Sequence, residues 1–287
     1  MKDILTSPRI EDMKRKARAR RIRLSILIFL LILSVIYALG YFSSNPRVTI
    51  NRIVVTGTRI INSVDIEDSV NKDISGKYFK LFDKKNIFIY PKRGIYKDLI
   101  QNFTRIEKLS IYRDNLNTLH IDISERSGTA LYCGNNVPEV DSEIGENCYF
   151  VNDDGYIFDR APYFSGNIYF KYYTPVSYTG DALGQQVLPK EVFQSHVRFV
   201  EGITKFKLKP THLVIDKDST GYIYLDHDLL ATSPKIIFKS DDNLEQLLDN
   251  LSLSMSKDSF ANEINSKYTT LLYIDMRFKN KVLYKFQ

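Results

Sequence analysis

The sequence predicts an α+β protein with three parts: an N-terminal transmembrane helix, a small β-α-α-β-β module and a larger β-rich domain. The last of these has a mixed or antiparallel sheet and a few helices. Three observations lead to this prediction. Leu24–Phe42 is an apolar run without a charge. Residues 48–126 carry strand and helix periodicities in turn. Residues 127–287 are mainly short alternating segments, and the 19 Tyr and 17 Phe of the chain suit a β-rich body.

The apolar run Leu24–Phe42 is long enough to cross a bilayer. At 1.5 Å per residue it spans about 28 Å, close to the ~30 Å hydrocarbon core of a membrane. The basic tail before it, 1–23, concentrates Lys and Arg between Lys14 and Arg23, and by the positive-inside rule such a cluster stays in the cytoplasm. After a short linker, 43–47, the bulk of the chain is then extracytoplasmic, as in a single-pass type II protein of the plasma membrane.

A cleaved signal peptide is the alternative for this segment. Ala38–Gly40 resembles the small-x-small pattern of a cleavage site. The long basic leader and the continuation of the apolar run through Tyr41 and Phe42 favour an anchor instead.

The net charge of +6 resembles that of a nucleic-acid-binding protein, but it is confined to the tail. Residues 1–23 hold nine Lys/Arg against three Asp/Glu, and the remainder holds 31 of each sign. A balanced body offers no broad surface for phosphates, so the sequence predicts no nucleic-acid partner.

The predicted module, 48–126, begins with "RVTINRIVVTG", a strand that ends at Gly57 and turns Ile53 and Val55 toward the helices. "NSVDIEDSVNKDI" is a helix capped by Asn62 or Ser63. A short extended piece, "NIFIY", and a second helix, "GIYKDLIQNF", follow. Two alternating strands, "IEKLSIYR" and "NTLHIDISER", complete the order β-α-α-β-β.

The predicted β-rich domain, 127–287, contains two amphipathic helices among its strands. "EVFQSHVRFVEGITKF" has an apolar set that includes Val192 and Phe193. The second helix follows Ser240 as N-cap, and its leucines, Leu244, Leu247, Leu248 and Leu251, are expected in the core rather than on a partner-binding face.

The two cysteines, Cys133 and Cys148, fall on the extracytoplasmic side, where disulfides persist. "TALYC" and "CYFVN" have the pattern of strands, with an acidic loop between them. A disulfide would close this loop and contribute about 3 kcal/mol by the loop-entropy argument. Free thiols are the alternative, and the absence of histidines nearby in the sequence disfavours a metal site.

The residues that carry chemistry are scattered along the chain. The four histidines, His120, His196, His212 and His227, lack the spacing of a zinc motif. "DKDSTGYIYLDH" begins like a calcium loop but has His227 where a bidentate Glu is required, so a β-turn is favoured. "NDDG" (152–155) is expected to form a hairpin turn. The sequence therefore predicts no enzyme, no cofactor and no small-molecule substrate.

The last two segments, from 271 onward, alternate strictly and predict a hairpin. A three-residue loop at Lys279–Lys281 pairs Met276 with Tyr284 and keeps Val282, Tyr284 and Phe286 on the buried face. The outward residues of the two strands are Tyr273, Asp275, Arg277, Lys281, Leu283 and Lys285.

These segments together resemble a known family. "IVVTGTRIINSVDI" and "RIEKLSIYRDNLNTLHIDISERSGTAL" resemble a POTRA domain, although Leu116 and Gly128 stand where prolines are usual. With a basic tail and single anchor before them, and with "CYFVNDDGYIFD" and "YIDMRFKNKVLYK" after them, they are similar to the FtsQ/DivIB family of bacterial cell-division proteins. The resemblance covers nearly the whole chain, and the order of its parts carries it.

The resemblance implies a non-enzymatic scaffold of the divisome at the septum of a bacterium. The anchor and module would recruit earlier division proteins, and the β-domain would bind bitopic coiled-coil partners of the FtsB/DivIC and FtsL type. The resemblance favours strand addition on the last hairpin, with Lys281 and Lys285 selecting acidic partner residues. A merely protected sheet edge is the alternative use of these lysines. Two other functions stay open: a POTRA chaperone of secretion or envelope assembly, and a membrane-anchored cell-wall enzyme.

Overall fold

The computed structural model describes residues 8–135, 137, 147–164, 166–175, 181–226, 234–278 and 281–287. The chain divides into two compact units, Met1–Glu125 and Arg126–Gln287. This division lies one residue from the predicted boundary between 126 and 127. The fold is mixed α+β, with an apolar N-terminal helix and a large sheet.

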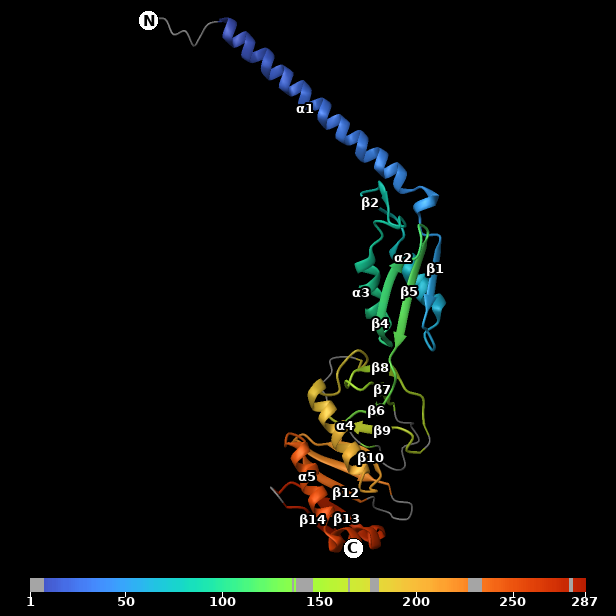
Figure 1. Cartoon of the computed structure of the whole chain (residues 1–287), viewed down its shortest axis with the longest axis vertical. Helices are drawn as coiled ribbons and strands as arrows, with labels where there is room; N and C mark the ends of the chain where they lie inside the picture. The colour runs from blue at the N-terminus through green and yellow to red at the C-terminus, as the bar shows by residue number, and fades with distance from the viewer. Residues whose placement is uncertain are drawn as a thin grey trace, which may run out of the picture. The chain divides into compact units, whose positions relative to one another are not determined.

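The first unit contains an apolar helix, a small sheet with two helices, and a short two-stranded ribbon (Figure 1). In chain order its elements are α1 (Pro8–Ser43), a 3₁₀ turn (Pro46–Val48), β1 (Arg52–Thr56), α2 (Ser63–Asp73), β2 (Lys77–Tyr78), β3 (Phe82–Asp83), α3 (Lys92–Asn102), β4 (Ile106–Arg113) and β5 (Thr118–Glu125).

Helix α1 begins well before the predicted membrane segment. It runs from Pro8, so the basic residues from Lys14 to Arg23 belong to the same helix as the apolar run. Met13–Ser43 is long and apolar enough to cross a membrane, and the apolar side chains along it are exposed. The predicted boundary at 23/24 is therefore a change of composition within one helix.

The end of α1 is bonded to the ribbon region of the first unit. Ser43 is buried; its Oγ accepts the N–H of Asp83 (3.0 Å), and its carbonyl accepts the side-chain amide of Asn86 (3.0 Å). The segment predicted as extended, "NIFIY", forms hydrogen-bonded turns instead, because the Ile89 and Tyr90 N–H groups both bond to the carbonyl of Asn86.

The three-stranded sheet of the first unit has the order β1-β5-β4, with β1 parallel to β5 and β4 antiparallel to it. Asn62, one of the two predicted caps, accepts the Val64 N–H at the start of α2 (3.1 Å). Both helices bury apolar residues against the sheet, and Ile53 and Val55 of β1 pack on this core as predicted. The buried core is Ile50, Ile66, Val70, Ile74, Ile87, Ile95, Leu99, Ile106, Ile111, Leu119, Ile121 and Ile123.

Glu125 closes the far end of this sheet. Its carboxylate accepts the backbone N–H groups of Arg59 (2.6 Å), Ile60 (3.0 Å) and Ile61 (3.0 Å) in the turn between β1 and α2. Partial burial acts to raise the pKa of Glu125, but these three hydrogen bonds bring it below its ordinary value. The carboxylate thus fixes the loop that leads into α2.

The ribbon β2–β3 turns through two non-glycine residues in the left-handed region. The turn is closed by Leu81 N–H to Tyr78 O (3.0 Å), and φ is +49° at Phe79 and +61° at Lys80. Positive φ at both central positions is the signature of a type I′ turn, which Asn-Gly usually occupies. Phe and Lys hold this conformation at a cost in backbone strain.

The second unit is built on one large sheet. Its strands are β6 (Ala130–Tyr132), β7 (Tyr149–Val151), β8 (Ile157–Arg160), β9 (Phe170–Tyr173), β10 (Pro210–Ile215), β11 (Thr220–Leu225), β12 (Lys235–Lys239), β13 (Leu271–Asp275) and β14 (Leu283–Phe286). Within the described residues these nine strands form a sheet in the order β14-β13-β12-β11-β10-β9-β6-β7-β8. Its helices are α4 (Lys190–Thr204), α5 (Leu244–Met255) and α6 (Asp258–Ser266), with a 3₁₀ turn at Tyr268–Thr270.

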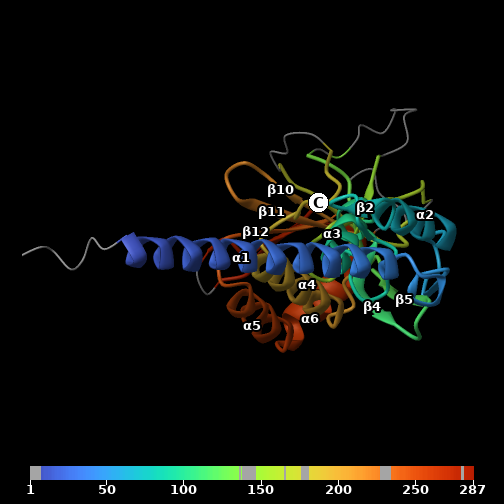
Figure 2. The ribbon, with the colours of Figure 1, turned by 90° about the horizontal axis from the view of Figure 1, so that it is seen from above.

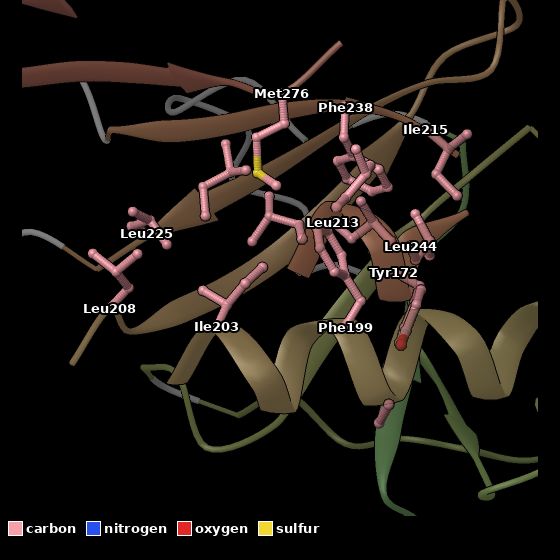
Figure 3. Packing of buried hydrophobic residues seen from close by; sticks show 14 of the residues in the cluster. Tyr172, Phe199, Ile203, Leu208, Leu213, Ile215, Leu225, Phe238, Leu244 and Met276 are labelled. Carbon is pink, nitrogen blue, oxygen red and sulfur yellow. The ribbon is translucent and has the colours of Figure 1, made fainter. Parts of the chain in front are cut away.

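Helices α4, α5 and α6 lie on one face of this sheet, as Figure 2 shows beside β10–β12. Figure 3 shows Phe199 and Ile203 pointing from α4 into a layer of strand side chains that includes Leu213 and Phe238. Leu244, Leu247 and Leu251 of α5 are buried in the same layer, which confirms that the leucines are core residues.

Three local predictions need correction. The N-cap of α5 is Asn243, which accepts the Gln246 N–H, because Ser240 lies three residues earlier and bonds to His196. Val192 is exposed on α4, and the inward position that the prediction omitted is His196. Helix α6 was not predicted at all.

The two smaller predictions around β7 are confirmed. Cys133 and Cys148 form a disulfide, directly beyond the last pair, Tyr132 and Tyr149, of the antiparallel strands β6 and β7. Residues 152–155 form the turn between β7 and β8, where Asn152 Oδ1 accepts the N–H groups of two residues that follow it.

The strained turn yields a prediction about stability. Replacing Phe79→Asn together with Lys80→Gly should stabilise the ribbon by about 1–3 kcal/mol, because both new residues adopt positive φ readily. Hydrogen exchange at the Leu81 amide, which the turn protects, should become slower. The control Leu116→Asn removes an exposed apolar side chain without altering this turn and should leave that amide unchanged. An unaltered exchange rate in the double variant would contradict the strain.

His196 yields a prediction about pH. The ring is fully buried on α4 and its Nε2 shares a hydrogen bond with Ser240 Oγ (2.9 Å). Burial lowers the pKa of His196 to about 4, so the folded state favours the neutral ring while the unfolded chain takes up a proton near its ordinary pKa of 6.5. The neutral His196 ring therefore contributes its full share to the free energy of unfolding above pH 6.5. This free energy should decline by about 3 kcal/mol as the pH falls to 4.

The measurement is denaturant unfolding between pH 4 and 7, with hydrogen exchange of the α4 amides assigning the transition to the second unit. His196→Gln keeps a donor for Ser240 and does not titrate, so its stability should fall less steeply over this range. Equal slopes for the two proteins would show that His196 is not the titrating group.

Candidate functional site

The β13–β14 hairpin lies at one end of the large sheet. β13 pairs with β12 on one side and with β14 on the other. Among the strands that the structure describes, β14 has β13 as its one neighbour. The other long edge of β14 thus carries backbone groups that a further strand can pair with.

The register of the hairpin differs from the predicted one by two residues. Tyr284 pairs with Ile274, where the sequence predicted Met276. A shift of two keeps every side chain on its predicted face, so the alternation that suggested the hairpin does not distinguish the two registers. The predicted loop residues Lys279 and Asn280 lie outside the described residues.

Helix α6 holds the core face of β14. The ring of Phe260 meets the ring of Tyr284 edge-on at 4.9 Å, and the Tyr284 hydroxyl donates to Glu263 Oε2 (2.7 Å). Lys267 bonds the other carboxylate oxygen of Glu263 (3.0 Å) and lies over the ring of Phe286. The hydrogen bonds from Tyr284 and Lys267 lower the pKa of Glu263. Val282 and Phe286 pack on the core as predicted, whereas Tyr284, predicted on the same buried face, is 37% exposed.

The outward face of the hairpin is basic and partly apolar. Tyr273 pairs with Lys285 across the two strands, and Leu283 follows in the same row opposite Asp275. Leu283 is 46% exposed, and Lys281 and Lys285 are exposed as well. Lys235 of β12 flanks Tyr273 on its other side. The structure therefore brings Tyr273, Lys285 and Leu283 together on one surface, as predicted.

Asp275 is the exception among the predicted contact residues. It is buried, and its carboxylate accepts the Arg277 backbone N–H (3.1 Å), Nε (2.9 Å) and Nη2 (2.6 Å). Burial acts to raise the pKa of Asp275, but the hydrogen bonds from Arg277 bring it below its ordinary value. Asp275 therefore positions Arg277, and Arg277 is the member of the pair that reaches the surface.

A row of stacked rings, which was not predicted from the sequence, continues this surface across the sheet. The rings of His212 and Tyr224 stack at 4.5 Å with an interplanar angle of 9°. Lys235 Nζ lies 5.0 Å from the ring centroid of Tyr222 and 5.8 Å from that of Tyr224. The signal for this row was the alternation in "GYIYL", whose tyrosines take the face opposite the buried Ile223 and Leu225.

The candidate metal residues do not converge in the part of the chain that the structure describes. Asp216 and Asp218 lie in the predicted β-turn, closed by Ser219 N–H to Asp216 O (3.0 Å), and Asp218 bonds Lys239 Nζ (3.2 Å). Among the described residues there is no cluster of three His, Cys, Asp or Glu that could hold a metal ion. His227 lies outside the described residues, and His120 belongs to the first unit, where it stacks on Tyr112.

No protein-family model matches the chain, and no curated protein has a significantly similar sequence. The functional assignment therefore depends on the sequence patterns and on the geometry of the described residues.

The buried pair at the base of the hairpin can be tested directly. Asp275→Asn should lower the unfolding free energy of the second unit by about 1–2 kcal/mol at pH 7, because it weakens a charged hydrogen-bond network. The folded pKa of Asp275 lies below its ordinary 3.8, so its contribution is present above pH 3.8 and is lost as the pH falls further. The difference between variant and wild type should therefore shrink in acid.

The matched control is Asp249→Asn, a change of an exposed carboxylate on α5. It should leave unfolding at pH 7 nearly unchanged. If Asp275→Asn lowered the unfolding free energy no more than this control does, the buried hydrogen bonds of Asp275 would not stabilise the unit.

Proposed function

We propose that this chain is a non-enzymatic, single-pass membrane scaffold of the bacterial cell-division machinery, of the FtsQ/DivIB type. Its N-terminus lies in the cytoplasm and α1 crosses the membrane, while the rest of the first unit and the whole second unit lie outside, at the division septum. The β13–β14 hairpin binds the extracytoplasmic part of a bitopic coiled-coil division protein of the FtsB/DivIC or FtsL type.

The observation that carries this proposal is the open edge of β14 beside a basic outward face. An extended segment can add to such an edge through backbone hydrogen bonds, and side chains beside the edge select the sequence. Lys281, Lys285 and the positioned guanidinium of Arg277 favour a segment with acidic residues, while Leu283 offers an apolar contact. Tyr273 borders the same surface.

The membrane topology rests on α1. The helix is apolar over Leu24–Phe42 and basic immediately before that segment, which favours a cytoplasmic N-terminus. The disulfide Cys133–Cys148 fits an oxidising, extracytoplasmic location for the second unit.

The first unit supports the comparison with a POTRA domain. Its order is strand, helix, ribbon, helix, strand, strand, and its three-stranded sheet has β5 in the centre. In the proposed scaffold this unit contacts earlier components of the machinery, while the second unit binds the coiled-coil partners.

The test is a capture experiment with the full-length protein from membranes of dividing cells. Leu283→Asp with Lys285→Glu reverses the character of the hairpin surface and leaves its core face intact. Capture of a bitopic coiled-coil protein should fall about tenfold or more, which corresponds to a loss of at least ~1.4 kcal/mol of binding free energy. Circular dichroism confirms that the variant is folded.

The control makes the same two types of change elsewhere on the second unit, at Leu253→Asp on α5 and Lys205→Glu at the end of α4. Both positions are exposed, and the control should retain full capture. Equal capture by hairpin variant and control would move the interface away from β14. Capture of unfolded envelope proteins instead would identify a chaperone.

A further inference from the structure

The β2–β3 ribbon lies beside the outer end of the apolar helix. Ser43 bonds the backbone of β3 and the side chain of Asn86, and a Cβ placed on Gly40 would stand 3.3 Å from the carbonyl oxygen of Leu81. Gly40 precedes the end of the apolar run at Phe42 by two residues, which is about 3 Å along the helix. The ribbon is therefore level with the boundary between hydrocarbon and headgroups.

The side chains of the ribbon suit this level. Phe79 at its tip is 90% exposed, an unusual state for a phenylalanine of a folded unit. Between Lys77 and Lys85 the sequence holds four lysines, Lys77, Lys80, Lys84 and Lys85, against one acidic residue, Asp83. An aromatic ring flanked by long cationic side chains is the combination that membrane interfaces favour, since the ring enters the interface and the amines reach phosphates.

The turn that presents this ring has a strained backbone. Both Phe79 and Lys80 have positive φ, where Asn and Gly would be unstrained. Strain of this kind persists where the side chain serves a purpose, and no packing inside the unit explains Phe79, because its ring is exposed.

A hollow of about 490 Å³ adjoins the ribbon on the side of the helix. Its wall is mainly apolar and includes Leu39, Phe42, Phe82 and Ile89, with Arg47 at the polar side. An apolar wall with one guanidinium matches the glycerol end of a phospholipid, where the acyl chains begin and the phosphate is attached.

We propose that the β2–β3 ribbon is a lipid-binding finger that rests on the outer face of the membrane crossed by α1. Phe79 enters the interface, and Lys77 and Lys80 contact anionic headgroups. This inference rests on the proposed single-pass topology. The contact gives the first unit a second attachment to the bilayer besides the helix and so limits how far it tilts.

The chain contains no tryptophan, so a single introduced tryptophan reports one position. Three full-length variants, Phe79→Trp, Ile60→Trp and Leu31→Trp, are reconstituted in nanodiscs of phosphatidylcholine and phosphatidylglycerol, with ordinary or brominated acyl chains. Ile60 is 68% exposed and lies beside Glu125 at the opposite end of the small sheet, so it serves as the control for an exposed residue. Leu31 lies within the apolar run and reports insertion of the helix.

The proposal expects the Phe79→Trp variant to emit at shorter wavelength than the Ile60→Trp variant. The tryptophan at position 79 should also lose fluorescence in brominated lipid, while the one at position 60 should not. In the Phe79→Trp background, Lys77→Gln with Lys80→Gln should reduce the quenching. The matched pair Lys97→Gln with Lys108→Gln, which changes two exposed lysines of α3 and β4, should leave it unchanged.

Each other outcome would overturn a distinct part of the proposal. Quenching at position 31 without quenching at position 79 would refute the finger and leave the anchor intact. An unquenched tryptophan at position 31 would instead refute the anchor. Shielding of position 79 by an added partner protein, but not by lipid, would assign the ribbon to that protein.

Discussion

The hydrogen bonds at Ser43 are the constraint on which the arrangement of the first unit depends. They join the last residue of a long apolar helix to the ribbon and to Asn86, and Ser43 is buried between them. The last carbonyl groups of a helix need hydrogen-bond donors from outside the helix. Here the side-chain amide of Asn86 donates to the carbonyl of Ser43, so the helix end is bonded directly to the rest of the first unit. The close approach of Leu81 to Gly40 adds a steric reason for a residue without a side chain at that position. In the proposed membrane topology, these contacts at the end of the helix set the level of the ribbon and of its exposed aromatic tip relative to the bilayer.

In the second unit, hydrogen bonds and ion pairs again determine which groups reach the surface. Helices α4, α5 and α6 cover one face of its sheet. On the other face, side chains contact one another through stacked rings and paired charges. The Asp275–Arg277 pair shows how this works, because a buried carboxylate holds a cation at the surface without leaving either group unpaired. Among the described strands of this sheet β14 and β8 are the two edge strands, and helix α6 fixes β14 from the core side through Phe260 and Glu263. A rigid edge is a better template for an added strand than a mobile one, since less order is lost on binding.

The sequence predicted most of this because alternation and helical spacing are local signals. The strand Ile106–Arg113, the Asn62 cap of α2, the leucines of α5 and the disulfide all follow from residues near one another in the chain. The misses have physical causes. Helix α6 has an apolar stripe of two buried residues, Phe260 and Ile264, among weak helix formers, so its periodicity is faint. The hairpin register was wrong by two because that shift preserves both faces, and Asp275 was misplaced because alternation reports the face of a residue and not its burial. Non-local contacts such as His196 with Ser240, or Ser43 with Asn86, leave no pattern in sequence.

Site-specific photo-crosslinking in living cells tests the central claim most directly. A photoreactive phenylalanine analogue at Leu283, an exposed residue of β14, places the probe on the proposed binding edge, and the same analogue at Leu253 on α5 serves as the reference. The account predicts a crosslink from position 283, and not from 253, to a single-pass protein with an extracytoplasmic coiled coil, and predicts that it appears in dividing cells. A crosslink to that protein from position 253 alone, or none from 283 in cells that divide normally, would contradict it.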